Sequence, residues 1–338
     1  MTYDDIARRA GVSTATVSRV LSGSGIVSEE RRRRVLDAVD ALSYRSNRAA
    51  KTLRRRRSDT IGLIVSDLEY PFVSSFARAV ENEAAAQGFA VLVCNTDEDL
   101  ERERFYYGLM IEEQVAGVII APATEDIRMV QPLVDARVPI VTFDRRFPDD
   151  PFDSVLLDNA SATGMLLEDL LRHGHRQFAA VIGTTTATPS RERLEAMRAV
   201  LDGVPDATLT VIENDLHGTV GVDHALETIG PAVLDRAERM PQRPTAFVCA
   251  NAIIVMSVLS ALGRNGFSVP GDAAVVGYDD VPGFDLFATP VTVVNQPTAW
   301  MGATAVARLV ERLDRPDAPA TATLAPPFMR HRASCGPR

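Results

Sequence analysis

The stretch that decides the fold of the first part of this chain is "YDDIARRAGVSTATVSRVLSG", residues 3–23. In its first half the apolar residues recur at helical spacing: Ile6, Ala7 and Ala10. Gly11 then interrupts the pattern, and Ser13 is a favourable N-cap for a second helix. In that second helix the apolar residues form one face: Val17, Val20 and Leu21. Two short helices joined by a tight turn that contains glycine form a helix-turn-helix unit.

A third helix is predicted directly after this unit. Ser28 is its N-cap, and Glu29 and Glu30 place negative charge in its first turn, where the helix dipole favours it. Its predicted buried stripe consists of Val35, Leu36, Val39 and Leu42. We therefore expect a small three-helix domain over residues 1–46.

The first 58 residues are strongly basic, although the whole chain of 338 residues has a formal net charge of -9. They hold fourteen Lys or Arg against six Asp or Glu, a net charge of +8, which leaves -17 for the rest. This contrast favours a basic module that contacts a polyanion, joined to an acidic body. A solvated charged surface on a helical hairpin is the alternative. Because the charge and the turn pattern agree, we predict DNA binding.

The second helix of such a unit lies in the major groove, where residues near its N-terminus reach the bases. The residues expected to face the base edges are Thr14, Ala15 and Arg19. Those expected to contact phosphates are Ser13, Thr16 and Ser18. Arg19 is suited to a bidentate contact with guanine, whereas Ala15 offers only a methyl group.

Two quoted stretches carry a resemblance to a known family: "IARRAGVSTATVSRVLSG" and "LSYRSNRAAKTLRRRRSDTIGLIV", residues 6–23 and 42–65. Their order and spacing resemble the head of the lactose-repressor and galactose-repressor (LacI/GalR) family of transcriptional regulators, and the resemblance continues along essentially the whole chain. It implies a repressor that binds a near-palindromic operator in double-stranded DNA as a homodimer.

The resemblance also implies a hinge and basic linker at residues 47–58. In that family the segment matching Asn47 to Leu53 folds into a helix when two subunits meet on an operator, and paired leucines at the position of Leu53 kink the duplex through the minor groove. The DNA contacts implied here are Asn47, Ala50, Lys51, Leu53, Arg54 and Arg55. The arginine run at 54–57 would neutralise phosphates beside the kink, or else serve only as a charged linker.

Residues 59–338 alternate short apolar runs with helical patterns. "IGLIVS", "AVLVCN", "GVIIAP" and "PIVTFD" form a first group, and "FAAVIG", "LTVIE", "TAFVCA" and "AAVVGYD" a second. This alternation predicts an α/β body of two doubly wound parallel-sheet subdomains. We expect the N-subdomain at about 59–157 with a return segment near 291–320, and the C-subdomain at about 158–288 with the C-terminal segment.

Several function classes lack their motifs. No G-x-G-x-x-G follows the first strand, and neither a P-loop nor a G-x-S-x-G elbow occurs, so we expect no enzyme and no cofactor. His173 and His175 form an H-x-H pair without a nearby ligand in the sequence, a weak zinc signal, so no metal site is expected. The three scattered cysteines and the absence of an apolar leader predict a reduced, cytoplasmic protein, and not a secreted solute-binding module.

The body resembles the periplasmic sugar-binding proteins, which serve as the effector domain of the same family. Ligands of such sheets bind outside the carboxyl ends of the strands. Matching the family's pocket positions one by one gives the candidate effector-binding residues: Tyr70, Phe72, Val73, Asp144, Arg145, Arg193, Leu216, Ala252 and Gln296. We interpret Asp279 and Asp280 as loop caps.

Two of these positions depart from the family pattern. Leu216 stands where an aromatic residue commonly stacks on the ligand, and Ala252 replaces a carboxylate that binds a hydroxyl group, at a cost of roughly 1 to 3 kcal/mol for an unpaired polar group. The expected effector is a sugar, a sugar phosphate or a nucleoside-like molecule, and a pocket with Asp144 and two arginines favours a phosphorylated or carboxylated one. The alternative is a pocket that has lost its ligand, in a constitutive repressor.

Operators read by helix-turn-helix dimers are near-palindromes because the protein is two-fold symmetric. We expect the body to form the dimer through the helix at 72–87 and its neighbours. The tail "LAPPFMRHRASCGPR" has no leucine heptad, so a dimer is expected and not a tetramer. Effector and operator affinity would then be coupled through the body.

Overall fold

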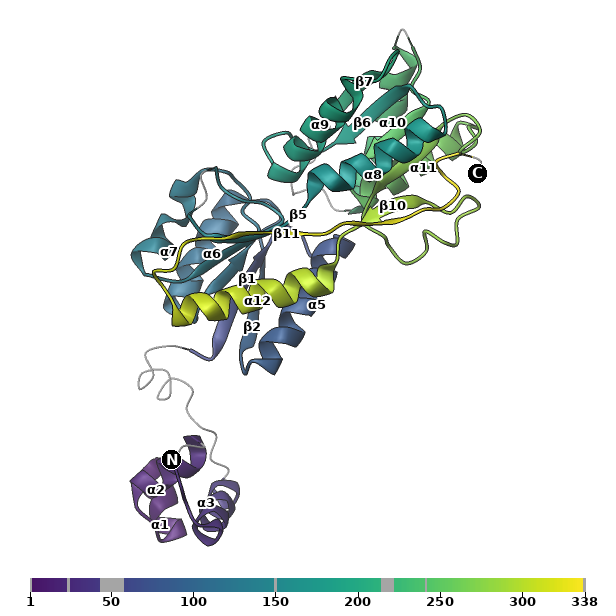
Figure 1. The fold of residues 1–338 in the computed structure, drawn as a ribbon. Coiled ribbons are helices and arrows are strands. Elements are labelled where there is room, and N and C mark those ends of the chain that lie inside the picture. The colour runs from purple at the N-terminus through teal and green to yellow at the C-terminus, as the bar shows by residue number, and fades with distance from the viewer. Residues whose placement is uncertain are drawn as a thin grey trace. The chain divides into compact units, whose positions relative to one another are not determined.

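The computed structural model forms two compact units, Met1–Ser58 and Asp59–Arg338, which are described separately. Figure 1 shows the elements of each. The residues that the structure describes are 2–22, 25–42, 58–148, 151–213, 222–240 and 242–336. Along these residues, none of the helices combines the length and the apolar character needed to cross a bilayer.

The first unit, hereafter the head, contains three helices: α1 (Tyr3–Ala10), α2 (Thr14–Ser22) and α3 (Glu29–Ala41). Its core consists of seven buried side chains: Ile6, Ala7, Ala10, Val17, Val20, Val35 and Ala38. The turn between α1 and α2 depends on Gly11, which has a φ of 61°. Arg34 of α3 donates to the Gly11 carbonyl at 3.2 Å, so the third helix fixes the turn. The predicted helix-turn-helix unit is confirmed.

The predicted stripe of α3 is wrong at one residue. Leu36 is 45% exposed, and Ala38 is buried in its place. In a helix with 3.6 residues per turn, Val35, Ala38 and Leu42 lie along one face, whereas Leu36 is turned by about 100° from Val35. The hydrophobicity of Leu36 did not outweigh its position on the helix.

The first sheet of the second unit, hereafter the body, has the strand order β11-β5-β4-β3-β1-β2, and all its pairs are parallel. Its strands are β1 (Thr60–Val65), β2 (Ala90–Asn95), β3 (Val118–Ile120), β4 (Ile140–Phe143), β5 (Asp153–Leu157) and β11 (Ala322–Ala325). Its helices are α5 (Pro71–Ala86), α6 (Leu100–Glu112), η1 (Ile127–Val130), α7 (Gln131–Asp135) and α12 (Thr298–Asp314).

Alternating side chains of β1 enter two separate cores. Ile61, Leu63 and Val65 pack with α5 and α12, whereas Ile64 packs with α6 and α7. Because successive residues of a strand point to opposite faces, these helix pairs cover the two faces of the sheet. Both faces are therefore buried, as a parallel sheet requires.

The second sheet has the order β12-β10-β9-β8-β6-β7, parallel except for the β10–β12 pair. Its strands are β6 (Gln177–Ile182), β7 (Thr208–Glu213), β8 (Ala246–Cys249), β9 (Ala274–Tyr278), β10 (Thr292–Asn295) and β12 (Phe328–Arg330). Its helices are α8 (Asn159–Arg172), α9 (Thr188–Leu201), α10 (Val222–Glu238) and α11 (Ala252–Arg264); α8 packs beside α9, and α10 beside α11. The predicted α/β architecture with two parallel sheets is confirmed.

The chain passes between the two sheets after β5, after β10 and after β11. The observed return to the first sheet therefore differs from the expected return near 291–320. Thr292–Asn295 pairs with β9 in the second sheet, and the returning segment extends to Ala325, which pairs with β5. Sequence patterns did not identify β5, β10, β11 and β12 as strands. Of these, β11 and β12 are largely exposed, so they lack the apolar run that marked the strands found from the sequence.

Candidate functional site

The predicted DNA-contacting residues of the head lie on and just before α2. Ser13, Thr14, Ala15 and Arg19 are exposed, and Thr16 and Ser18 are partly exposed, whereas Val17 and Val20 of the same helix are buried. The helix thus presents a polar face outward and anchors its apolar face in the core. The structure brings all six predicted residues of this helix to one surface.

Ser13 confirms its predicted role as N-cap. Its Oγ accepts a hydrogen bond from the Thr16 amide at 3.2 Å and lies 3.0 Å from Thr16 Oγ1. The first amides of an α-helix have no partner within the helix, so a side-chain oxygen at this position stabilises its start. By contrast Ser28, the residue before α3, makes no side-chain capping hydrogen bond.

Seven predicted site residues lie outside the described residues. They are Asn47, Ala50, Lys51, Leu53, Arg54, Arg55 and Leu216.

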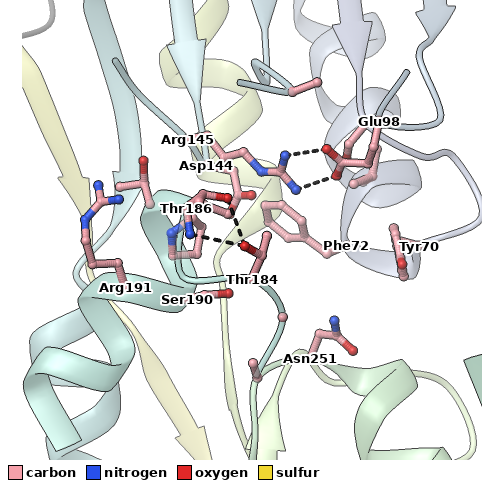
Figure 2. A pocket seen from close by; sticks show the side chains of 18 of the residues that line it. Tyr70, Phe72, Glu98, Asp144, Arg145, Thr184, Thr186, Ser190, Arg191 and Asn251 are labelled. Atoms are coloured by element: carbon pink, nitrogen blue, oxygen red, sulfur yellow. Dashed lines mark hydrogen bonds and ion pairs between the residues drawn. The ribbon is translucent and has the colours of Figure 1, made fainter. Parts of the chain in front are cut away.

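The other eight predicted effector residues line one cavity of about 630 Å³ in the body: Tyr70, Phe72, Val73, Asp144, Arg145, Arg193, Ala252 and Gln296. The cavity lies at the carboxyl ends of strands from both sheets, where ligands of such sheets bind. Its volume falls within the usual range for small-molecule sites, roughly 300 to 1,000 Å³. Figure 2 shows its lining side chains.

On the side of the first sheet, the cavity wall combines aromatic rings with a charged pair. Pro71 begins α5, which places Tyr70 and Phe72 at the wall. Arg145, which follows β4, donates through Nη1 to Glu98 Oε2 at 2.6 Å, and its Nη2 donates to the other carboxylate oxygen. Figure 2 shows these two side chains facing each other. Burial raises the pKa of Asp144, and the Arg145 charge partly offsets this rise.

On the side of the second sheet, the wall is organised by Arg193 of α9, which is 5% exposed. Its Nε donates to Asn159 Oδ1 at 2.8 Å, and its Nη1 donates to the Ala250 carbonyl. Its guanidinium carbon also lies 3.9 Å from the centre of the Tyr278 ring. The buried cation is therefore held by two hydrogen bonds and an aromatic face, which fixes its direction toward the cavity.

Asp279, interpreted from the sequence as a loop cap, also lies in the wall of this cavity. The Gln296 amide donates to Asp279 Oδ1 at 2.8 Å. Burial raises the pKa of Asp279 to about 6, and the nearby Arg193 charge opposes this rise. Asp280, the neighbouring residue, forms ion pairs with Arg330 and Arg332 instead of capping a loop.

The charged lining residues are nearly balanced in sign. The acidic ones are Glu98, Glu125, Asp126, Asp144 and Asp279; the basic ones are Arg145, Arg146, Arg191 and Arg193. Arg145 pairs with Glu98, and Arg191 Nη2 lies 2.8 Å from Glu125 Oε1. The structure therefore argues against the expectation of two arginines open to an anionic ligand. The comparison with the family's motifs identified Arg145, but it did not identify its partner Glu98, which lies 47 residues earlier in the sequence.

Sequence reasoning missed the loop after β6. Thr184, Thr185 and Thr186 line the cavity with hydroxyl groups, and Arg191 follows at the start of α9. Asn251 also lines it, while its Oδ1 caps α11 by accepting from the Ile254 amide at 2.9 Å. The available signal was the polar run "GTTTATPSR" directly after an apolar strand, at the sheet edge where ligands were expected.

The H-x-H pair does not act as a unit in the structure. His175 Nδ1 lies 3.0 Å from Thr245 Oγ1, and its Nε2 donates to the Cys335 carbonyl at 3.2 Å. Both ring nitrogens of His175 are thus used in hydrogen bonds.

Comparisons with known families divide this chain as the structure does. Residues 2–47 match the family described as "Bacterial regulatory proteins, lacI family", and residues 167–335 match the "Periplasmic binding protein-like domain". The first match covers all three helices of the head, and the second covers most of the second sheet with its helices.

Two proteins that are similar to this chain over most of its length are described as transcriptional regulators. A probable HTH-type transcriptional regulator, EndR of Paenibacillus polymyxa, is 32% identical over 93% of this chain and 91% of its own. The HTH-type transcriptional repressor PurR of Aliivibrio fischeri is 31% identical over 94% of this chain and 93% of its own.

Two solved structures show the same arrangement of elements. The lac repressor dimer bound to operator and the anti-inducer ONPF is 26% identical, with a TM-score of 0.83 over 100% of this chain and 99% of that one. The transcriptional regulator CelR in complex with cellobiose is 28% identical, with a TM-score of 0.72 over 99% of each chain.

Proposed function

Because this chain belongs to the lacI family of bacterial regulatory proteins, we propose that it represses transcription as a homodimer on a near-palindromic operator in the cytoplasm. A small molecule in the cavity of the body would control its affinity for DNA. The observation that carries the proposal is the outward polar face of α2, held by a capped helix start and a buried apolar face.

Within the head, Arg19 is the residue proposed to read a base. It is exposed on α2, six residues after the Ser13 cap, and a guanidinium can form two hydrogen bonds with guanine in the major groove. Thr14 and Ala15 would also face the base edges, whereas Ser13 and Thr16 at the helix start, with Ser18, would contact phosphates, which are attracted to a helix N-terminus. These contacts set the position, and Arg19 sets the sequence.

For the effector we propose a neutral, hydroxyl-rich molecule, such as a mono- or disaccharide. The charged groups of the cavity largely pair with one another, so they offer strong hydrogen bonds without a net charge for an anion to neutralise. Thr184 and Thr186 add hydroxyl groups, and Phe72 adds an apolar surface for a sugar ring. The complex of CelR with cellobiose supports this class.

Two observations favour a working cavity over one that has lost its ligand. Gln296 Oε1 is buried at the wall without a hydrogen-bond partner among the described residues, an acceptor suited to a ligand hydroxyl. Asp144 and Asp279 are also present as carboxylates at the wall, which can replace the acceptor that Ala252 lacks. Each would lower the cost of burying sugar hydroxyls.

The dimer contact is proposed to lie beside α5. The outward face of α5 is polar, with Ser74, Arg78 and Glu81 exposed. The edge strand β2, which contacts α5, exposes a large apolar side chain, Val93, at 40%. Unpaired edge strands and exposed apolar residues are features of association surfaces. The solved structure of the lac repressor is that of a dimer bound to operator, which supports a dimer for this chain.

Control by the effector follows from linkage. The cavity is lined by both sheets, so a ligand that contacts Arg145 and Arg193 together stabilises one arrangement of the two subdomains. If that arrangement changes how two heads meet on DNA, effector and operator affinity are coupled by one factor in both directions. Whether the effector releases the protein from the operator or recruits it to the operator is an outcome of the experiment.

The function is tested by selecting bound duplexes from a random library at two salt concentrations. We expect enrichment of a near-palindrome whose binding weakens at high salt but keeps its sequence preference. If the protein binds DNA but no sequence is enriched, it is a general polyanion-binding protein and not a sequence-specific regulator. The effector class is tested separately by thermal-shift screening, where stabilisation by sugar phosphates but not by neutral sugars would overturn it.

A further inference from the structure

A second polar cluster lies in the body, outside the cavity described above. Asp169 belongs to α8 and His173 follows its last turn, whereas His331 and Cys335 follow β12 near the end of the chain. The ligand atoms of the two histidines and the cysteine lie within 4.8 Å of one another. Nothing in the regulatory function described above uses these side chains.

The distances around His331 resemble the edges of a coordination tetrahedron. His331 Nε2 lies 3.4 Å from Cys335 Sγ and 3.2 Å from Asp169 Oδ1. Zinc bonds to sulfur at about 2.3 Å and to nitrogen or oxygen at about 2.0 to 2.1 Å, so two tetrahedral ligands are roughly 3.3 to 3.6 Å apart. The side chains are therefore spaced as ligands of one ion.

One ring nitrogen of His173 makes a hydrogen bond, which leaves the other nitrogen available. Its Nδ1 lies 2.8 Å from the Asp169 carbonyl oxygen, which can only accept, so Nδ1 carries the proton of this hydrogen bond. In the neutral ring Nε2 then holds the lone pair. Metal-bound histidines usually donate their second nitrogen to a carbonyl or carboxylate in this way, which fixes the ring.

The carboxylate of Asp169 is a further observation that points to a ligand. Asp169 is 6% exposed, and its Oδ2 makes no hydrogen bond among the described residues, although His173 Nδ1 lies 3.9 Å from it. A buried carboxylate oxygen without a partner is costly unless a cation compensates it.

The arrangement is not that of a cysteine nucleophile with its base. Both the Cys335 thiol and the Asp169 carboxylate approach the same nitrogen of His331, whereas a catalytic histidine uses one nitrogen for the nucleophile and the other for the carboxylate. Cys335 is also fully buried, so a substrate could not reach it. A metal ion explains better why Cys335 and Asp169 both lie close to the same nitrogen of His331.

We propose that His173, His331 and Cys335 form a structural binding site for a divalent transition-metal ion of the zinc type, with Asp169 beside them. Two imidazoles and a thiolate are three ligands of a kind that zinc accepts, and the Asp169 carboxylate, whose Oδ1 lies 3.2 Å from His331 Nε2, is the candidate for the fourth. His331, with a side chain 27% exposed, provides the access route from solvent. Thr292 donates to Cys335 Sγ at 3.3 Å and orients the thiol.

The bound ion would hold the C-terminal segment on the second sheet. The segment after β12 lies against α8 and is joined to it through side chains about 160 residues apart in sequence. An ion that binds only the folded body raises its stability by mass action. We therefore expect zinc to raise the melting temperature of the full-length chain.

The test uses cobalt(II) as a spectroscopic probe on the reduced, tag-free, full-length chain after treatment with a chelator. We expect one cobalt ion per chain, with the intense visible bands of a tetrahedral site and a near-ultraviolet thiolate-to-cobalt band that zinc displaces. Cys335→Ser should lose the thiolate band, and His331→Gln should weaken binding at least about tenfold. Because His331 is partly exposed, this second variant tests the site without removing a core side chain.

Matched controls are Cys94→Ser and His224→Gln, which lie outside the cluster and should keep the wild-type spectrum and affinity. Far-ultraviolet circular dichroism checks that each variant is folded. The proposal is overturned if cobalt binds without a thiolate band, if Cys335→Ser keeps the band, or if the controls lose binding as much as the cluster variants do.

Discussion

The head and the body hold their candidate functional residues in opposite ways. In the head, the six candidates on and just before α2 are consecutive or nearly so, and they are exposed or partly exposed above a small core of seven side chains. In the body, the candidates run from Tyr70 to Gln296, and several of them are buried and bonded to one another. An exposed set can be changed without disturbing the fold, whereas a buried set couples binding to stability.

The difference predicts which substitutions alter stability and which alter recognition alone. Exposed side chains of α2 contribute mainly when DNA is bound. The buried charges of the cavity contribute in the free protein as well, because each has been removed from water and depends on its partner.

The largest expected effect is in the body. Arg193→Ala removes a buried cation that bonds Asn159 and Ala250 and lies near Asp279, and it should lower the free energy of unfolding by about 3 to 5 kcal/mol. Urea unfolding followed by the fluorescence of Trp300, the single tryptophan, reports on the body. Arg198→Ala, exposed on the same helix, should change it by less than about 0.5 kcal/mol. Equal effects of the two would contradict the role of burial.

A second effect in the body depends on pH. The pKa of Asp279 is raised to about 6, so the folded body takes up a proton more readily than the unfolded chain, and this group lowers stability increasingly as pH rises from 4 to 6. Asp279→Asn should therefore raise the free energy of unfolding at pH 7.5 by roughly 2 to 3 kcal/mol. The gain should disappear near pH 4.

The control for this pH dependence is Asp202→Asn, an exposed carboxylate next to α9. Its curve should run parallel to that of the wild-type chain. Ligand affinity measured in the same Asp279→Asn variant should fall, since a carboxylate at the wall accepts ligand hydroxyls more strongly than an amide does. A variant that is more stable and binds as tightly would remove Asp279 from the site.

In the head, Arg19→Ala should lower affinity for the selected operator by about 1 to 3 kcal/mol, or roughly 5- to 150-fold, with little change in binding to random DNA. Fluorescence anisotropy on both duplexes measures this, with Arg33→Ala, exposed on α3, as the control. The melting temperature should stay the same. A large loss on both duplexes would mean that Arg19 contacts only phosphates.

The smallest expected effect is on the stability of the head, and it is measured by substituting two serines. Ser13→Ala removes the oxygen that caps α2 and should cost the head about 1 kcal/mol, whereas Ser28→Ala removes no capping hydrogen bond and should cost little. Native-state hydrogen exchange of the α2 and α3 amides can resolve such local changes. If Ser28→Ala costs as much as Ser13→Ala, the capping geometry is not what stabilises α2.

Sequence reasoning succeeded where the physical cause is local. The Ser13 cap and the turn at Gly11 depend on neighbours within a few residues, and both are present. It failed where a stripe was assigned by hydrophobicity alone, as at Leu36, and at β11 and β12, which are short and largely exposed. Matching the family's pocket positions identified eight residues that line one cavity, but it did not identify the side chains with which they pair.

What the sequence by itself determined is the helix-turn-helix head and the alternation of strands and helices in the body. Both depend on periods of 3.6 and 2 residues, which can be read along the chain. Only the tertiary structure decided the pairing of Arg145 with Glu98, the place of Asp279 at the wall, and the meeting of His173 with His331 and Cys335. These contacts join residues 17 to 162 positions apart, because parallel sheets bring the ends of distant strands together, and no local pattern records which loops will meet there.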